Sequence, residues 1–196
     1  MLAAFCYPVC AGEIEGGRKE QIEALSPDGQ FAFRYMGESD SGKQTYDLID
    51  KRSGKVLTSV AASDPDLGSS ARFHMAVLWR PDSKVFALTA TLWKRGSNLL
   101  VYVRTGSSFR EIKLPQLGAD IPAKAKRGKS FPHVVEMNSQ RAKKWQKDGS
   151  LVVEIESIDD GNDGSVTATR TVVLGLQRSG HAKIVKSTIK FATEKP

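Results

Sequence analysis

The chain has few of the residues from which covalent or metal-bound sites are built. Its 196 residues include two cysteines and three histidines, and no two histidines stand at the spacing of metal ligands. Both cysteines, Cys6 and Cys10, lie within residues 1–11, so the rest of the chain has no thiol. We therefore expect no disulfide framework, no thiol nucleophile, no metal and no cofactor.

Long apolar runs and nucleotide-binding motifs are also missing. No stretch approaches the roughly 20 apolar residues of a membrane-spanning helix, so we expect no transmembrane segment. Residues 37–43 fit the start of a phosphate-binding loop, but Gln44 stands where Ser or Thr would hold magnesium, and a strand-like run follows where a helix is needed. Residues 159–164 suggest a calcium loop, yet Thr171 occupies the position of its bidentate glutamate. Both runs fit hairpin tips better.

Residues 1–11 carry no charge and are mostly apolar or small. Together with the modest side chains of Val9-Cys10-Ala11, this is typical of the latter part of a secretory signal peptide. The alternative is a buried N-terminal strand or a disordered end. We predict export, to the periplasm or outside the cell, and a single domain over residues 12–196, a length that suits one sizeable core.

A short turn containing an aspartate recurs three times along the chain. The three turns are Ser26-Pro27-Asp28-Gly29, Arg80-Pro81-Asp82-Ser83 and Gln146-Lys147-Asp148-Gly149. Proline presets the backbone angle at the second position of a tight turn, and Asp or Gly suits the positions after it. The three aspartates are therefore interpreted as turn formers and not as catalysts or metal ligands.

An apolar strand is expected after each of these turns. The residues three, five and seven positions after the aspartate are mostly apolar and share one face of a strand: Phe31, Phe33 and Tyr35; Val85, Ala87 and Thr89; Leu151, Val153 and Ile155. In the second repeat the alternate positions are apolar too, which predicts burial on both faces. Two more strands follow in each repeat and are joined by a turn with Gly, as in an antiparallel meander; they span 44–50 and 55–60, 98–104 and 109–114, and 167–176 and 183–191.

In this order of turns and strands the chain resembles the blades of WD40-like propellers of the TolB type, over residues 20–60, 73–115 and 142–192. The resemblance implies an all-β, propeller-like fold of three repeated antiparallel meander units. Propellers usually have four to eight blades, so three units do not readily close a ring. An open or sandwiched β-structure, a tightly wound three-bladed assembly and a ring completed by another chain remain alternatives, and the oligomeric state stays open.

The positive charge of the chain is concentrated before the third repeat. Residues 124–147 hold eight basic residues against the single acidic Glu136, an excess equal to the net charge of +7 of the whole chain. The same region contains an insertion at about 116–141, where any helix must begin near Pro122. Seven of these basic residues are candidates for binding an anionic partner: Lys124, Lys126, Arg127, Lys129, Arg141, Lys143 and Lys144.

These features favour an exported, non-catalytic binding module that engages a protein or another anionic ligand through the basic insertion. A solvated insertion whose lysines only keep the chain soluble accounts for the same charge. Nucleic acid is not expected, because no aromatic ladder interleaves the charges and the protein is expected to be exported. The alternative function is a hydrolase-type enzyme with a loop-borne site, for which no catalytic residue is nominated.

Overall fold

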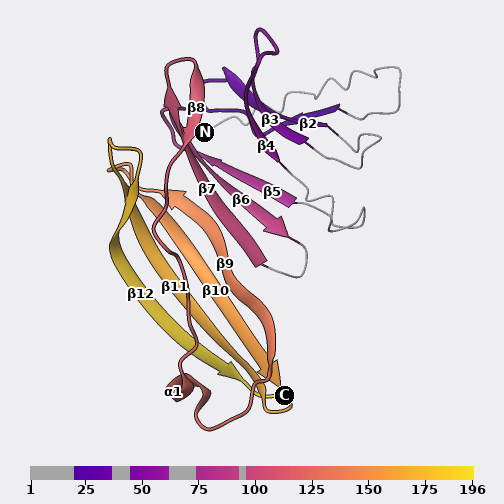
Figure 1. The fold of residues 1–196 in the computed structure, drawn as a ribbon, viewed down its shortest axis with the longest axis vertical. Coiled ribbons are helices and arrows are strands. Elements are labelled where there is room, and N and C mark those ends of the chain that lie inside the picture. Colours follow the sequence, from indigo (N-terminus) through magenta and orange to yellow (C-terminus); the bar gives the residue numbers. More distant parts are fainter. Residues whose placement is uncertain (1–19, 37–44, 62–73, 93–95) are drawn as a thin grey trace, which may run out of the picture. The chain divides into compact units, whose positions relative to one another are not determined.

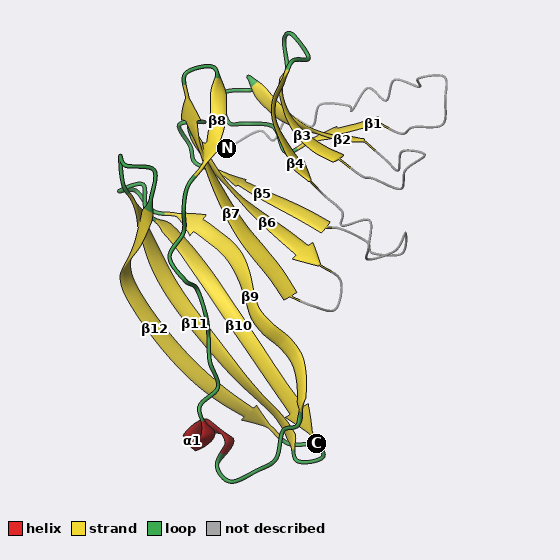
Figure 2. Cartoon of the chain, viewed as in Figure 1, coloured by secondary structure: helices red, strands yellow, loops and turns green. Residues whose placement is uncertain are grey.

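A computed structural model of the chain describes residues 20–36, 45–61, 74–92 and 96–196, and these residues form β-strands almost throughout (Figures 1 and 2). The chain divides into two compact units, Met1–Ser70 (unit 1) and Ala71–Pro196 (unit 2), so the single domain predicted for residues 12–196 contains both. The signal segment predicted at residues 1–11 lies outside the described residues.

Unit 1 holds one antiparallel sheet with its four strands in chain order. The strands are β1 (Glu20–Glu23), β2 (Phe31–Met36), β3 (Thr45–Asp50) and β4 (Val56–Ala61). Phe31 and Phe33 alternate along β2 as predicted, and both are buried, together with Tyr46 and Leu48 of β3. The rings of Phe33 and Tyr46 stack at 4.8 Å. The first predicted repeat is confirmed as a four-stranded meander.

Unit 2 holds two more antiparallel sheets of four strands each. One contains β5 (His74–Trp79), β6 (Val85–Leu92), β7 (Gly96–Thr105) and β8 (Ser108–Glu111). The other contains β9 (His133–Trp145), β10 (Leu151–Gly161), β11 (Gly164–Leu176) and β12 (Ala182–Glu194). The all-β class and the three antiparallel meanders are thus confirmed, and a four-stranded meander is the form of a propeller blade.

The three aspartate turns share one hydrogen-bond pattern. The carboxylate of Asp28, Asp82 or Asp148 accepts the backbone N–H two residues later at 3.0 Å. The residue directly after each aspartate has a positive φ: 69° at Gly29, 57° at Ser83 and 81° at Gly149. The interpretation of these aspartates as turn formers is confirmed.

These turns should make unit 2 sensitive to acid. Hydrogen bonds from Arg80 lower the pKa of Asp82, and hydrogen bonds from the hydroxyl and N–H of Ser150 lower the pKa of Asp148. A carboxylate whose pKa is lowered by folding stabilises the fold at pH values above its unfolded-state pKa of about 4. That stabilisation is lost as the pH falls through the folded-state pKa. Because both groups are exposed, we expect a small effect, confined to pH values below about 4. A carboxyl-carbon NMR titration showing Asp148 with an ordinary midpoint would contradict it.

Strand β6 is buried on both faces, as its sequence predicts. Five consecutive residues from Val85 to Thr89 are at most 6% exposed. On one face, Phe86 stacks on Tyr102 with ring centroids 4.9 Å apart and also contacts Trp79 and Phe109. The other face of β6 joins the core that the two sheets of unit 2 share.

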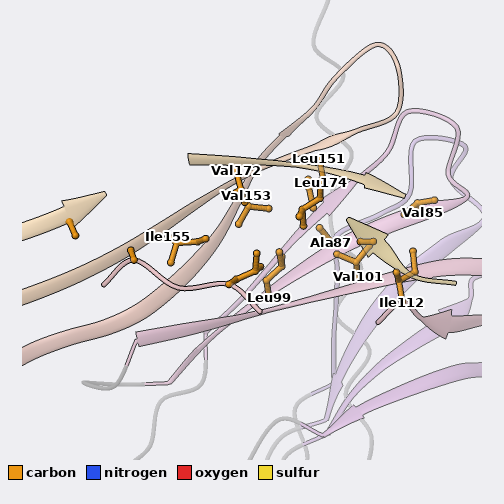
Figure 3. Close-up of a cluster of buried hydrophobic side chains, with 14 residues drawn as sticks. Val85, Ala87, Leu99, Val101, Ile112, Leu151, Val153, Ile155, Val172 and Leu174 are labelled. Atoms are coloured by element: carbon orange, nitrogen blue, oxygen red, sulfur yellow. The ribbon is translucent and has the colours of Figure 1, made fainter. Parts of the chain in front are cut away.

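That shared core lies between the sheet β5–β8 and the sheet β9–β12 (Figure 3). Leu99 and Val101 of β7 supply one side, and Leu151, Val153 and Ile155 of β10 supply the other. The face of the sheet β9–β12 that carries these β10 residues is called the inner face below, and its opposite the outer face. On β11 the inner face carries Val172 and Leu174, also fully buried, because they lie opposite Val153 and Leu151.

Polar contacts join β9 to strands β5 and β7 of the neighbouring sheet. The indole N–H of Trp145 donates to the Leu78 carbonyl at 3.0 Å, and the guanidinium of Arg80 lies over the Trp145 ring at 5.9 Å. Near the middle of β9, the buried hydroxyls of Ser97 on β7 and Ser139 bond each other at 2.8 Å. Strand β9 is therefore held by both sheets, which fixes where the preceding insertion must end.

Candidate functional site

The insertion before β9 begins as an extended strap, residues 114–122, that runs along the inner side of the sheet β9–β12 to the short helix α1 (Ala123–Lys126) (Figure 1). Its Leu117 and Ala119 are buried in the shared core. The Arg170 guanidinium on β11 donates to the Gly118 carbonyl at 2.8 Å and to the Ser187 hydroxyl on β12 at 2.9 Å. One arginine thus ties the strap to two strands.

Asn138 on β9 supplies the second anchor of the strap. Its φ of 52° lies in the left-handed region, where the register of β9 against β10 shifts between Glu156 and Ile158. Asparagine tolerates this conformation better than most residues. The Asn138 side-chain carbonyl accepts the Ala119 N–H at 2.8 Å, and the Asn138 N–H donates to the Ser157 hydroxyl at 2.9 Å. This β-bulge therefore positions the strap.

Helix α1 starts directly after Pro122, as the sequence predicts, and ends in a left-handed residue. Arg127 has a φ of 50° and Gly128 a φ of 76°. A helix commonly ends on a left-handed residue, but that residue is usually glycine, because a side chain there costs about 1 kcal/mol. An arginine therefore stands at a position whose backbone conformation favours glycine.

The insertion is shorter than predicted, because β9 begins at His133 rather than near residue 142. Arg141, Lys143 and Lys144 consequently lie on a strand and not in a loop. Carboxylates pair with two of these cations, and the pairs are Arg141 with Glu136 at 2.8 Å and with Glu156 at 3.3 Å, and Lys143 with Glu154 at 3.1 Å. This part of the predicted cluster is largely neutralised by its own sheet.

The other four predicted cations lie on and after α1, and two of them contact the β10–β11 hairpin. The Lys126 ammonium lies 2.9 Å from the Asp159 carboxylate, and the Lys129 ammonium donates to the Asp163 carbonyl at 3.3 Å. Asp159 and Asp163 belong to the acidic run that suggested calcium in the sequence. Their contacts show that they hold the insertion in place.

Lys124 and Arg127 are exposed, and no carboxylate of the described residues forms an ion pair with either. They line a hollow of about 380 Å³ together with residues of α1 and β12, and we call this set the basic corner: Lys124, Ala125, Arg127, Ile189, Lys190, Phe191 and Thr193. Ile189 and Phe191 are 43% and 40% exposed. The corner therefore combines unpaired cations with exposed apolar surface.

Sequence reasoning missed the β12 half of this corner. Lys183, Lys186 and Lys190 are spread along the strand from 182 to 194, so they do not form a cluster in the sequence. The composition of that strand could have indicated them, because its only acidic residue is Glu194. Its exposure follows from its position at the edge of the sheet order β12-β11-β10-β9.

A second hollow, of about 700 Å³, lies at the hairpin turns of unit 1 and is lined by Asp28, Gly29, Gln30, Asp50, Lys51 and Arg52. Its two carboxylates are engaged in turns: Asp28 accepts from Ser26 and Gln30, and Asp50 accepts from Ser53. The hydrogen bonds from Ser53 lower the pKa of Asp50. The chemistry of this hollow is explained by turn formation.

Groups suited to catalysis do not converge in the described part of the chain. No three His, Cys, Asp or Glu side chains gather there in a way that could hold a metal ion. Burial, followed by the nearby charge of Glu111, raises the pKa of Tyr102 to about 12, so this phenol stays protonated at neutral pH. Trp93, which stands beside Lys94 and Arg95 in the sequence, lies outside the described residues.

Comparison with known proteins adds little to this description. No protein-family model and no curated protein matches the sequence. One solved structure to which the chain is similar is TolB from Acinetobacter baumannii, with 11% identity and a TM-score of 0.36 over 89% of this chain. The chain spans 44% of that protein's length. Because the likeness is so distant, the architecture rests on the strands themselves.

One further finding concerns membranes. None of the helices in the ranges described above has the length and apolarity that crossing a bilayer requires.

Proposed function

We propose that this chain is an exported, non-catalytic binding module that engages an anionic partner through the basic corner. The observation that carries the proposal is that Lys124 and Arg127, which form no ion pair with the described residues, lie beside the exposed Ile189 and Phe191. Export is part of the proposal and rests on the uncharged, apolar residues 1–11. The alternative of a hydrolase gains no supporting observation from the described residues.

The conformation of Arg127 supports a role in binding more than one in folding. Its backbone adopts a φ of 50°, which glycine would adopt without strain. A side chain at such a position costs about 1 kcal/mol, and Arg127 forms no ion pair with the described residues that would offset this strain. The paired cations of β9 provide the contrast, because breaking their ion pairs would reduce any gain from a new partner.

The expected affinity is moderate. Three exposed cations, Lys124, Arg127 and Lys190, contribute about 0.5 to 1 kcal/mol each when they meet partner anions at the surface. Burying the exposed parts of Ile189 and Phe191 adds about 25 cal/mol per Å² of apolar area. Such a site uses charge to speed encounter and to select anions, and it weakens as salt is added.

The test removes these three charges without disturbing the fold. The triple variant Lys124→Gln, Arg127→Gly and Lys190→Gln should bind a carboxylate-bearing cation-exchange resin roughly 10 to 100 times more weakly and elute at clearly lower salt. The matched control is Lys51→Gln, Arg52→Gln and Lys55→Gln, which removes the same charge from exposed residues of unit 1. If both triple variants eluted at the same salt, the basic corner would have no special role and the proposal would be wrong.

A further inference from the structure

Strand β12 forms an edge of its sheet, and most of its length is open. From Val185 to Glu194 every residue is exposed. Within the described part of the chain, only Lys113 pairs with the outer edge of this strand, at its very start: Lys113 accepts the Ala182 N–H at 2.9 Å. An edge strand presents unpaired N–H and C=O groups that another strand can satisfy.

The residues that present these groups follow from the register. Because the Ala182 N–H points away from β11, the Ala182–Leu176 pair is one of the pairs that do not exchange backbone hydrogen bonds, and such pairs alternate along the ladder. Val185 is the extra residue of a bulge between Ile184 and Lys186. Beyond the bulge, the residues whose backbone groups point outward are Ser187, Ile189, Phe191 and Thr193.

The side chains beside this edge have different character on the two faces of the sheet. Ile189 and Phe191 share the inner face with their partners Arg170 and Ala168, next to the hollow lined by Lys124 and Arg127. The side chains of Lys186 and Lys190 extend from the opposite, outer face, because they alternate with those residues, although Lys190 also borders the hollow. On the inner face, the edge therefore offers apolar side chains next to two cations. On the outer face, it offers lysines.

We propose that an extended acidic segment of another polypeptide adds to β12 as a fifth strand of this sheet. Its backbone bonds the outward groups of residues 187–193. Its apolar side chains cover Ile189 and Phe191, and its carboxylates meet Lys186 and Lys190 on the outer face and Lys124 and Arg127 at the corner. This inference rests on the proposed function and specifies the class of the anionic partner and its mode of binding.

A second copy of this chain fits the same edge less well. Two β12 strands side by side would bring together two rows of lysines, formed by Lys183, Lys186 and Lys190 of each copy, and like charges on neighbouring strands are destabilising. Lysines on an edge strand protect natural sheets from such self-association. An acidic strand turns the same row of charges into an attraction.

The probe is the peptide acetyl-Glu-Val-Glu-Val-Glu-Val-Glu-amide, titrated into the full chain and followed by fluorescence anisotropy of a labelled copy. Two modified peptides of equal charge serve as matched controls, one N-methylated at two of its valines and one at its two inner glutamates. In strand addition only one alternate set of peptide N–H groups faces β12. Methylation of that set should weaken binding more than tenfold, and methylation of the other set less than threefold.

Amide hydrogen exchange of the protein supplies an independent readout. With the unmodified peptide bound, the amides of Ser187, Ile189, Phe191 and Thr193 should exchange at least tenfold more slowly, while those of Lys186 and Lys190, which already bond β11, should change little. Equal retention or equal loss of binding by the two methylated peptides overturns strand addition. The proposed function survives that result if the corner triple variant still weakens binding, and it fails as well if that variant binds the unmodified peptide normally.

Discussion

Ile155→Ala is expected to lower the free energy of unfolding of unit 2 by about 3 kcal/mol, the largest effect that we predict for a single substitution. Ile155 is fully buried in the core shared by the two sheets of unit 2 (Figure 3). Truncation of its side chain creates a cavity and removes contacts between the two sheets. Close-packed interiors relax only in part around such a loss. The predicted change corresponds to more than a hundredfold shift in the folding equilibrium.

Urea unfolding followed by tryptophan fluorescence measures this change selectively. All three tryptophans, Trp79, Trp93 and Trp145, belong to unit 2, so the fluorescence transition reports that unit. The control is Val134→Ala on β9, where the valine is 63% exposed, and a change within about 0.5 kcal/mol is expected. A midpoint for Ile155→Ala equal to that of the control would mean that the two sheets do not share this core.

Arg170→Met is expected to destabilise unit 2 by about 2 kcal/mol and to weaken binding at the basic corner. Methionine keeps much of the length of the arginine stem but donates no hydrogen bond, so the Gly118 carbonyl and the Ser187 hydroxyl both lose their charged partner. Hydrogen bonds to charged groups contribute about 1.5 to 3 kcal/mol each, and partial exposure reduces that figure here. Release of Gly118 frees the strap that carries α1.

The comparison variant Arg170→Lys separates these roles. A single ammonium on a flexible stem reaches one of the two partners at a time, so about half of the stability loss is expected. Urea unfolding and binding of the acidic peptide should then fall together in the order wild type, Lys, Met. Loss of stability without any loss of binding would show that the strap does not position the basic corner.

The positions of most strands could be predicted from the sequence, because turn residues and the alternation of apolar side chains act locally. The aspartate turns need particular backbone angles, and residues such as Phe31 and Phe33 share one face of a strand because they stand two positions apart. The burial of β6 on both faces was also predicted from a local pattern, because its alternate positions are apolar too. How the sheets group was not predicted, because packing of Leu99 against the β10 residues depends on contacts between distant parts of the chain.

Only the insertion side of the candidate site was predicted from the sequence. The charge cluster identified Lys124 and Arg127, but the sequence could not show that β9 would place Arg141 and Lys143 beside carboxylates of the neighbouring strand. The left-handed bulge at Asn138 interrupts the alternation that would have marked β9 as one long strand. The β12 residues were missed because their exposure is a consequence of strand order, which no local pattern contains.

The central claim, that an anionic partner meets this chain at the basic corner, is tested most directly by mapping backbone amide shifts while the full chain is titrated with the acidic peptide. We predict that the largest shifts fall at residues 124–127 and 187–193, and that they disappear in the triple variant Lys124→Gln, Arg127→Gly and Lys190→Gln. Shifts centred on Arg141, Lys143 and Lys144 of β9, or on the turns of unit 1, would contradict the claim.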